Sequence, residues 1–530
     1  MTQSITTNQK PMSIVRQSFC SKKYLTATLT TILFSSIVTF IIFWCTDVLQ
    51  SSLISKLVVS NNTPMFEWWS KPPVRALYKI KIFNYTNVED FESGKANKLK
   101  VEEVGPYIYR ETVTRIDKKF YPNGTISFRE KRNFQWEGGS PDDEIVTVPS
   151  VPLISAIAMA RDQPFYIQMA LTSAISFLDT IKLKSTGPFV NVHAGGLLWG
   201  YDDNLFNAAK PFIKLQKNIP FDKFGLLAYK NGISEHSLTM NTGQDDHKKL
   251  GLIERVGGNS NRHVWNDDEC DQVYGTEGYM FPPNMYDDPN STLDIYSVEM
   301  CRTLRLKRNG NGKSFDIPTL KFSPPADTFT STPIKNSCFC PISNNESEKK
   351  TSCPPAGIFN GSACTFGLPI VSSFPHFLNG DPMLRENIDG LNPSSELHET
   401  HIEVHPRVGI LIGGSSKIQI NIEARRAASV PFLGKIKDGQ ILPLIWIEVT
   451  VDKIPEPILS LMWHAYFTIT IAEIIIKWIS VLGVIIPTFI MINIFIKNRK
   501  YHDFADKKNI TRQNKFLDGS IKKIQDGSGV

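Results

Sequence analysis

Two long uncharged apolar segments, one near each end of the chain, constrain this 530-residue protein most strongly. The first runs from Tyr24 to Thr46, and the second from Trp478 to Ile496, or from about Ile474 with its outer turn. Each has close to the roughly 20 residues that a helix needs to cross the hydrocarbon of a bilayer. Bulky residues occupy the place of a signal-peptide cleavage site, so we expect an uncleaved anchor. The sequence therefore predicts membrane helices at 24–46 and 474–496.

The charges of the two tails predict how these helices are oriented. Residues 1–23 carry four basic side chains and no acid, and residues 497–530 carry nine basic side chains and four acids. The formal total is +6, so the chain between the tails sums to −3. Cytosolic flanks are rich in Lys and Arg, so both tails are predicted to be cytosolic and residues 47–473 to form one extracellular or lumenal domain. The excess of basic residues is explained by this topology and by attraction of the tails to anionic lipid. It indicates no nucleic-acid partner.

Six of the eight cysteines fall between residues 270 and 364 of the predicted outer domain. An even, clustered set in an exported region indicates three disulfide bonds, with a zinc site as the alternative. Zinc is disfavoured because Cys338-x-Cys340 lacks the usual gap of about two to four residues and has no equivalent partner pair. The residues alone leave the pairing open. The six are Cys270, Cys301, Cys338, Cys340, Cys353 and Cys364.

Candidate modification and sorting sites agree with this topology. Cys20, beside Lys22 and Lys23 at the predicted membrane face, is a candidate palmitoylation site, with an unmodified thiol as the alternative. Tyr501-His-Asp-Phe504 fits a tyrosine-based adaptor motif, although such short matches are frequent by chance. Asn509 opens an N-x-S/T sequon in the cytosolic tail and should stay unmodified. Glycans are predicted at the sequons of the outer domain, Asn61, Asn84, Asn123, Asn290, Asn345 and Asn360.

The outer domain reads mainly as short strands joined by turns, because proline and glycine interrupt it about every ten residues. Lys417–Glu423 alternates apolar and polar residues, the pattern of a half-buried strand. Ile441–Val451 is nearly continuously apolar and β-branched, and Pro443 argues against a central position near the start of that strand. Tyr121–Thr125 is a predicted turn followed by another strand.

One region departs from this β character. Pro152–Arg161 and Tyr166–Leu178 carry apolar residues at helical spacing, and Gln163-Pro164 separates them. In the second segment the predicted apolar stripe is Ile167, Ala170, Leu171, Ala174, Ile175 and Leu178. The two helices could simply pack on the sheet, or they could form a mobile apolar cap over a ligand entrance.

Signatures of catalysis are mostly absent. His398-x-x-His401-x-x-x-His405 resembles a metal cluster, but Ile402 and Val404 indicate an extended segment in which His398 faces away from the other two. No nucleophile elbow or dinucleotide fingerprint occurs. Adjacent carboxylates such as Asp202-Asp203 are typical of solvated loops. The sequence therefore predicts no enzyme, no catalytic residue, no metal site and no cofactor.

Seven strings resemble those of one family, the class B scavenger receptors, which include fatty acid translocase, the high-density-lipoprotein receptor and lysosomal integral membrane protein two. Val104–Glu111 resembles the family's G-P-Y-x-Y-R-E strand, and Leu197–Asp202 is similar to its L-W-G-Y string, with Asn204 in place of a proline. The resemblance covers nearly the whole chain, including both membrane segments. The strings that follow in the family's order are Cys301-Arg302, Cys338-Phe-Cys340, Pro375-His-Phe377, Gly390-Leu-Asn-Pro393 and Pro443-Leu-Ile-Trp446.

The resemblance implies a fold. The outer domain would be an irregular antiparallel β-barrel, capped by helices at its membrane-distal apex and crossed by a largely apolar tunnel that leads toward the bilayer. The predicted helical hairpin lies where the family has that apex. The resemblance also implies the disulfide pairs Cys270–Cys338, Cys301–Cys364 and Cys340–Cys353.

The resemblance further implies a receptor that binds fatty acids, sterols, phospholipids, lipoproteins or other anionic particles and transfers lipid to the membrane. Lys182 and Lys184, just after the hairpin, are the candidate ligand-binding cations, with an ordinary solvated loop as the alternative. A sorting receptor for a protein cargo is the second hypothesis. A channel is disfavoured because the membrane segments carry no polar stripe beyond Glu473 and Lys477. The sequence does not decide whether the protein resides in the plasma membrane, the lysosome or the endosome, or whether it forms homo-oligomers.

Overall fold

The computed structural model describes residues 12–180, 187–216, 222–265, 267–283, 288–332, 336–340, 353–365 and 367–525. The chain divides into two compact units. Residues 53–466 form the unit that we call the outer domain, and the two ends of the chain form the helical unit.

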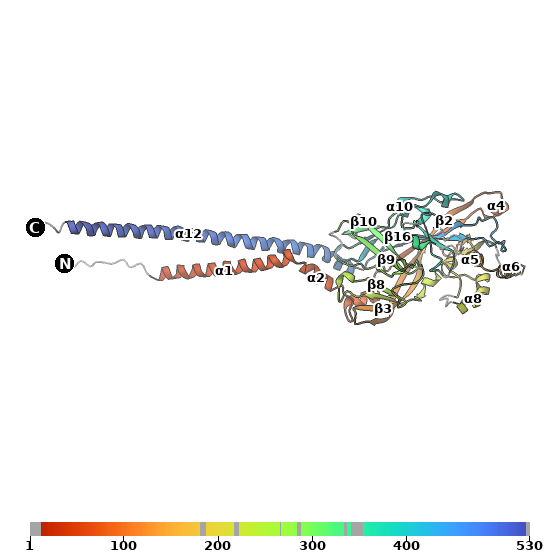
Figure 1. Ribbon diagram of the computed structural model, residues 1–530, viewed down its shortest axis with the longest axis horizontal. Coiled ribbons are helices and arrows are strands. Elements are labelled where there is room, and N and C mark those ends of the chain that lie inside the picture. The colour runs from red at the N-terminus through yellow and green to blue at the C-terminus, as the bar shows by residue number, and fades with distance from the viewer. Residues whose placement is uncertain are drawn as a thin grey trace. The chain divides into compact units, whose positions relative to one another are not determined.

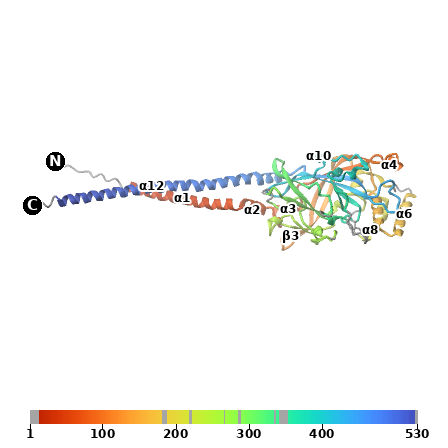
Figure 2. The same cartoon turned by 45° about the horizontal axis from the view of Figure 1, so that its top comes forward.

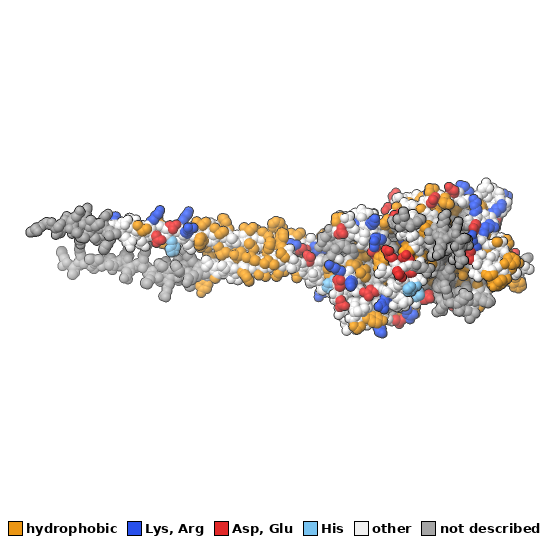
Figure 3. Space-filling view, viewed as in Figure 1, with side chains coloured by type: hydrophobic (Ala, Val, Ile, Leu, Met, Phe, Trp, Pro, Cys, Tyr) orange, Lys and Arg blue, Asp and Glu red, His pale blue; other side chains and the backbone are white. Residues whose placement is uncertain are grey.

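The helical unit contains two long helices that run side by side, α1 (Met12–Cys45) and α12 (Ile469–Gln525) (Figures 1 and 2). One candidate membrane span, Tyr24–Cys45, lies in α1, and the second, Glu456–Lys515, includes most of α12. Hydrophobic side chains cover much of this unit (Figure 3). The helices approach closely at Gly483, where an added Cβ would lie 2.2 Å from Oγ of Ser36. Lys477 pairs with Glu473 at 2.7 Å, so the predicted pair at the end of the second segment is present.

The described part of the outer domain is built on a 15-stranded, mainly antiparallel sheet. Its main path is β8 (Ile253–Val256), β7 (Leu238–Asn241), β3 (Thr125–Gly139), β2 (Leu99–Phe120), β1 (Leu77–Tyr85), β17 (Gln440–Thr450), β16 (Leu411–Ala424), β15 (His401–Val404), β11 (Ile317–Ser323), β10 (Arg302–Ser314) and β9 (Thr292–Ser297). Four further strands pair beside this path, β6 (Gly232–Ile233), β12 (Ile358–Asn360), β13 (Ile370–Ser373) and β14 (Ile388–Asp389).

The two ends of this path meet at Thr276. This residue bridges Leu252, next to β8, and Ile295 on β9. The sheet is therefore nearly closed into a barrel, which confirms the predicted fold class and leaves few free strand edges. A separate pair of strands, β4 (Ile145–Pro149) and β5 (Phe189–His193), leads into and out of the helical region.

The remaining helices are mostly short. The α-helices are α2 (Val48–Ser55), α3 (Pro64–Ser70), α4 (Val88–Ser93), α5 (Val151–Ala160), α6 (Phe165–Thr180), α7 (Ala194–Trp199), α8 (Asn204–Gln216), α9 (Asp268–Asp271), α10 (Ser395–His398) and α11 (Glu456–Trp463). The other helical turns are η1 (Ala228–Lys230), η2 (His247–Lys249), η3 (Ser337–Phe339), η4 (Pro375–Phe377), η5 (Pro382–Arg385) and η6 (His464–Thr468).

Helices α5, α6 and α8 gather at one end of the outer domain (Figures 1 and 2). The predicted hairpin is confirmed, since α5 and α6 nearly match the two predicted segments. The buried residues of α5 and α6 belong to one apolar cluster of the core. Leu53, Leu57 and Ala465, at the two ends of the domain's own chain, belong to another. The helices thus form a cap away from the place where the chain enters and leaves this domain.

Strand β17 is central, between β1 and β16, which corrects the expectation drawn from Pro443. Pairing with β1 ends at Ile445, before the proline is reached. On the other side, the register with β16 shifts between Ile420 and Asn421, opposite Pro443. The proline therefore lies where both ladders are already interrupted, so its missing N–H is tolerated.

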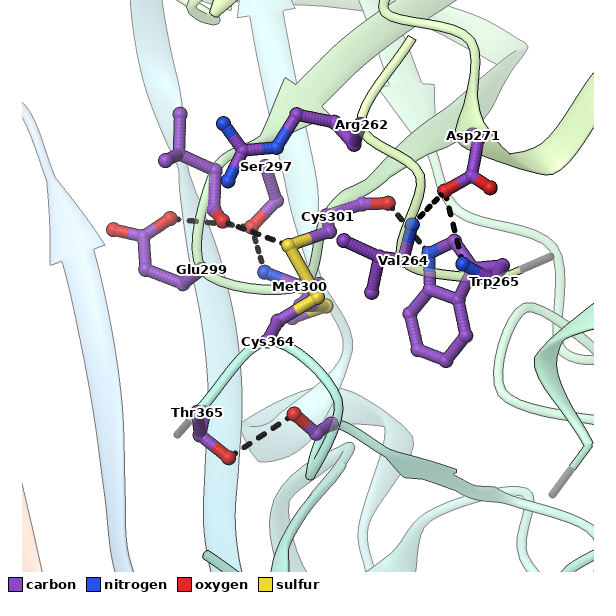
Figure 4. Close-up of a disulfide and its surroundings, with 12 residues drawn as sticks. Arg262, Val264, Trp265, Asp271, Ser297, Glu299, Met300, Cys301, Cys364 and Thr365 are labelled. Carbon is purple, nitrogen blue, oxygen red and sulfur yellow. Dashed lines mark hydrogen bonds between the residues drawn. A yellow bond between two sulfur atoms is a disulfide. The ribbon is translucent and has the colours of Figure 1, made fainter. Parts of the chain in front are cut away.

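Three disulfides join the segments that run beside the barrel. Figure 4 shows Cys301–Cys364 with the indole of Trp265, whose Nε1 donates to the carbonyl oxygen of Cys301 at 2.9 Å. Asp271 accepts from the backbone N–H groups of Val264 and Trp265 at 2.6 and 2.9 Å, which fixes this loop. The pairs are Cys270–Cys338, Cys301–Cys364 and Cys340–Cys353, the same pairs that the family resemblance implies.

Candidate functional site

The cap presents a group of exposed apolar side chains on α6 and the end of α5. The exposed fractions of Phe165, Tyr166 and Phe177 are 68%, 69% and 64%. Hydrophobic side chains gather at this end of the outer domain in the space-filling view (Figure 3). Exposed apolar groups of this kind mark sites for lipid or protein partners. We call this group the cap surface, made of Met159, Phe165, Tyr166, Ile167, Met169 and Phe177.

Helix α6 is held by polar side chains together with part of the stripe predicted from the sequence, since Leu171 and Ile175 pack on the main core cluster. Gln168 donates to the carbonyl oxygens of Arg161 and Gln163 at 3.2 and 3.1 Å, and its Oε1 accepts from the N–H of Ser429 at 3.2 Å. Thr172 donates to the carbonyl oxygen of Ser429 at 2.7 Å.

The inward face of α6 is therefore rotated from the predicted one. It consists of Gln168, Leu171, Thr172, Ile175 and Leu178, whereas the predicted members Ile167, Ala170 and Ala174 are exposed. Apolar residues lie on both sides of α6, so periodicity alone did not decide which side would be buried. Because polar anchors hold the helix, its aromatic side chains are left free to contact a ligand.

The predicted ligand-binding cations, Lys182 and Lys184, lie outside the described residues. Other cations lie at the edge formed by α4, β14 and the turn before β17, and sequence reasoning missed them. These lysines come from segments that are far apart in the sequence and meet only in the folded chain. An added Cβ on Gly94, for example, would lie 2.2 Å from Nζ of Lys435. The exposed members are Lys95, Lys98, Lys100, Lys435 and Lys437.

Inside the barrel, β2 and β3 place charged side chains on the same face as apolar core residues. Alternate residues of a strand share a face, so Glu111 and Arg115 of β2 lie with the buried Val113. Glu130 and Arg132 of β3 follow the buried Phe128 in the same way, and their own side chains pair at 2.5 Å. Arg132 also lies 3.5 Å from Glu111.

This network joins a further carboxylate, since Arg115 pairs with Glu277. Burial raises the pKa of Glu277 and of Glu111, while burial is outweighed at Glu130, whose pKa is lowered by Arg132 and Arg115. The network is a strongly polar part of the interior. A lipid tunnel through the barrel would have to pass beside it, and the tunnel stays a prediction.

A second polar cluster lies beside β17. Nε2 of His376 lies 2.7 Å from Oε2 of Glu103, and the rings of His376 and His398 stack with their centroids 4.4 Å apart. Glu103 also accepts from Nε1 of Trp446 at 2.9 Å and pairs with Lys81 at 2.5 Å. Burial raises the pKa of Glu103, but these donors outweigh it and lower the pKa to about 2.

The ligand atoms of Glu103, His376 and His398 lie within 4.8 Å of one another, so we tested whether they suit a metal ion. Nδ1 of His376 accepts from the N–H of Asn392, and Nδ1 of His398 accepts from the N–H of Ser394, each at 3.0 Å. Each neutral ring therefore carries its proton on Nε2, the atom that would have to bind the ion. The donor set does not fit a metal, and the cluster is a hydrogen-bonded group in which two buried histidines meet the more exposed Glu103.

The histidines predicted to lie in one extended segment have separate partners. His401 begins β15, so this part of the extended segment is confirmed, whereas His398 ends the short helix α10. Nε2 of His405 lies 3.0 Å from the carbonyl oxygen of Met462 and is buried.

The sequons differ in accessibility. Asn61, Asn123 and Asn290 are exposed, and Asn84 is half-buried with its Oδ1 accepting from the N–H of Thr147 at 2.8 Å. Asn360 is only 6% exposed, and its Oδ1 accepts from the N–H of Ser362. The glycan at Asn360 stays a prediction, and the burial of this side chain argues against it.

Three further predicted sites fall on the tails or outside the described residues. Asn345 lies outside them. Cys20 lies in α1, but its side chain is not among those described. Tyr501 and Phe504 are both exposed on α12.

Comparison with known proteins agrees with the resemblance of the sequence strings. The profile of the CD36 family matches residues 27–495. Scavenger receptor class B member 1 of Rattus norvegicus is 31% identical over 410 residues, which cover 75% of this chain and 75% of that protein. The Bos taurus protein of the same name is 30% identical over 76% of this chain and 75% of its own length. Lysosome membrane protein 2 of Rattus norvegicus is 28% identical, over 76% and 81%. With its two candidate membrane helices, this chain is an integral membrane protein that belongs to the CD36 family.

Proposed function

We propose that this protein is a receptor that captures lipid, or a lipid-bearing particle, on the cap surface and passes lipid through the outer domain to the membrane. The observation that carries the proposal is the exposure of Phe165, Tyr166 and Phe177 on a helix held by polar anchors. Membership of the CD36 family and the resemblance to class B scavenger receptors support it.

The capture step follows from the hydrophobic effect. Burying apolar surface contributes roughly 25 cal/mol for each Å² removed from water, so three aromatic side chains can hold an apolar particle without a polar contact. Each exposed CH₂ of a lipid costs about 0.8 kcal/mol in water, and an apolar path through the barrel would remove that cost without covalent chemistry. The proposal therefore needs no catalytic residue and no cofactor.

Charge would make a second contribution to the binding of anionic particles, separable from the apolar contribution. Lys182 and Lys184 are proposed to attract anionic particles, and this attraction should fall with salt because the Debye length is about 10 Å at 0.1 M. The apolar contribution should be nearly independent of salt.

The test compares neutral and anionic lipid vesicles on cells that display the full chain. Changing Phe165, Tyr166 and Phe177 to Ser should lower the binding of both kinds of vesicle. The double variant Lys182→Gln, Lys184→Gln should lower only the salt-sensitive binding of anionic vesicles. A matched control changes three exposed apolar residues far from α6 in the sequence, Trp136, Ile233 and Phe315, to Ser.

Equal binding by the cap variant and the control would overturn capture at the cap surface. Transfer is measured separately, as delivery of a fluorescent lipid into liposomes that contain the full chain. Binding without delivery would leave a receptor and remove the transfer step.

A second function, the sorting of a protein cargo, is favoured by one observation on the tail. Tyr501 and Phe504 of the adaptor-like motif are both exposed, and one relative is named a lysosome membrane protein. Tagging the full chain and its Tyr501→Ala variant would distinguish lysosomal from plasma-membrane residence. A shift of the variant to the plasma membrane would support a working sorting signal.

A further inference from the structure

Two buried histidines hold residues 390–400, the segment that leads from β14 through α10 to β15. His376 and His398 are 5% and 4% exposed, and their rings stack with an interplanar angle of 12°. Nδ1 of His376 accepts from the N–H of Asn392, and Nδ1 of His398 accepts from the N–H of Ser394, each at 3.0 Å. The segment is thus fastened at two points by nitrogen atoms that can accept only while they are unprotonated.

The turn that carries His376 has a strained backbone. His376, Phe377 and Asn379 have φ angles of 53°, 55° and 59°, in the left-handed region that non-glycine residues rarely adopt. The backbone N–H of His376 donates to Oε1 of Gln419 at 2.6 Å, and its Nε2 donates to Oε2 of Glu103 at 2.7 Å. Such strain persists only where the surroundings fix the residue, and it points to a role beyond packing. The turn therefore holds this ring in one orientation and one tautomer.

Charged groups from four strands surround the two rings. Glu103 already pairs with Lys81, so part of its negative charge is compensated before either ring takes up a proton. Nζ of Lys417 donates to the carbonyl oxygen of Leu397 at 2.8 Å and brings a positive charge to the segment itself. A proton on the rings would therefore enter a site that is already cationic in part. Among the described residues, these groups are Lys79 and Lys81 on β1, Glu103 on β2, Lys417 on β16, Glu448 on β17, and Glu396 and Glu399 within the segment.

We propose that His376 and His398 form an acid-operated latch, which keeps residues 390–400 closed on the barrel at neutral pH and releases them in an acidic compartment. Protonation turns each Nδ1 from an acceptor into a donor that faces a backbone N–H, so both hydrogen bonds to the segment are lost. Two charged rings with centroids 4.4 Å apart would also repel each other. Release would uncover Trp446, which is 4% exposed and in edge contact with His398. The latch goes beyond lipid capture and does not depend on it.

The closed segment should be favoured at neutral pH, because the released ring binds a proton more tightly than the closed one. Burial lowers the pKa of His398 to about 4, and the charges of His376 and the nearby lysines act in the same direction. The released ring should titrate near 6.5, the ordinary value. The preference for the closed form is therefore complete above about pH 6.5 and is lost as the pH falls toward 4. Between pH 7.4 and 5.0, the ratio of released to closed segment should rise roughly 25-fold through His398 alone.

Hydrogen exchange of the full chain in phosphatidylcholine nanodiscs tests the latch. Amide protection in a peptide that covers residues 390–400, corrected for the intrinsic effect of pH on exchange, should fall by roughly that factor of 25 between pH 7.4 and 5.0. A peptide from β17 should stay more strongly protected at both pH values, which separates local release from unfolding of the domain. Hydroxyl-radical oxidation of Trp446 is a second readout and should increase over the same range.

A variant separates titration from packing. His398→Asn should remove most of the change with pH, because Oδ1 of asparagine can accept from the N–H of Ser394 but does not titrate. His247→Asn is the control and should respond as the wild type does. Nδ1 of His247 lies 2.8 Å from the carbonyl oxygen of Gly243, so a proton on that atom breaks no hydrogen bond.

Four results would overturn the latch. They are constant protection of residues 390–400 from pH 7.4 to 5.0, loss of protection in β17 before the segment, a wild-type response of His398→Asn, and a reduced response of His247→Asn equal to that of His398→Asn. If His398→Asn does not fold, the wild-type exchange of the segment and of β17, together with the oxidation of Trp446, still decides the question.

Discussion

The guanidinium of Arg110 donates to both carboxylate oxygens of Asp452, at 2.5 Å to Oδ1 and 2.9 Å to Oδ2. It also donates twice to Glu137, at 2.6 and 2.8 Å, and once to the carbonyl oxygen of Arg75 at 3.1 Å. Arg110 lies in β2 within the string Val104–Glu111 that resembles the family. The contacts tie β2 to β3 and to the segment that follows β17, so they hold together parts of the barrel far apart in the sequence.

We expect Arg110→Lys to destabilise the protein, because lysine cannot reproduce two bidentate pairs. Glu137 and Asp452 are partly exposed to water, so the loss should be about 1–3 kcal/mol, below that of a fully buried pair. Thermal unfolding of the full chain measures it. Arg129→Lys is the control, since the Arg129–Asp117 pair is exposed and should contribute less than about 1 kcal/mol. Equal shifts of the melting temperature in both variants would contradict the structural importance of Arg110.

Acid should destabilise the outer domain through His405. Burial, together with the charge of Arg407, lowers the pKa of His405 to about 4, while the unfolded chain would titrate near 6.5. The unfolded state therefore binds the proton more readily, so this contribution is complete above about pH 6.5 and is lost as the pH falls toward 4. The loss is at most about 1.4 kcal/mol for each pH unit.

Melting temperatures between pH 7.5 and 4.5 test the role of His405. His405→Gln should flatten the decline, because glutamine can donate to the carbonyl oxygen of Met462 but does not titrate. His193→Gln, at an exposed histidine, should leave the decline unchanged. An unaltered slope in the His405 variant would mean that other groups cause the acid sensitivity.

Removal of a disulfide should lower the free energy of unfolding more when the loop that the disulfide closes is longer. Cys340–Cys353 closes a separation of 13 residues and Cys301–Cys364 one of 63. In the chain-entropy description, the first should contribute about 3 kcal/mol and the second about 1 kcal/mol more. Paired Cys→Ala variants and thermal unfolding give the comparison. Non-reducing peptide mapping should first recover both pairs, and free thiols at these positions would contradict the arrangement.

Glycans should follow accessibility and topology rather than the sequon alone. We expect glycans at the exposed Asn61, Asn123 and Asn290, and none at the buried Asn360. Asn509, in the tail predicted to be cytosolic, should be unmodified as well. Single Asn→Gln variants and mass measurement after glycosidase treatment check each site. A glycan on Asn509 would overturn the assignment of that tail to the cytosol.

Cys20 should carry a palmitoyl group, since it lies beside two lysines at the predicted membrane face. Acyl-exchange labelling of the Cys20→Ser variant should lose the signal. Cys45, a free and exposed cysteine at the other end of the same apolar segment, provides the control. A loss caused only by Cys45→Ser would place the modification at the wrong end of the helix and contradict the prediction.

The sequence by itself determined the properties that depend on local composition and short-range pattern. Two uncharged runs of bilayer length gave the membrane helices, and alternation in Lys417–Glu423 gave a strand that the structure extends into β16. The helical hairpin also followed from spacing, because apolar residues at intervals of three and four bury one side of a helix wherever it packs.

Only the tertiary structure decided which side of α6 is buried and which side forms the cap surface. Ser429, roughly 260 residues away in the chain, donates its N–H to Oε1 of Gln168 and accepts from Thr172, and Leu171 and Ile175 pack on the same core. Periodicity reports how a segment divides into faces, but the free energy that selects the buried face comes from partners elsewhere in the fold, which no local pattern contains.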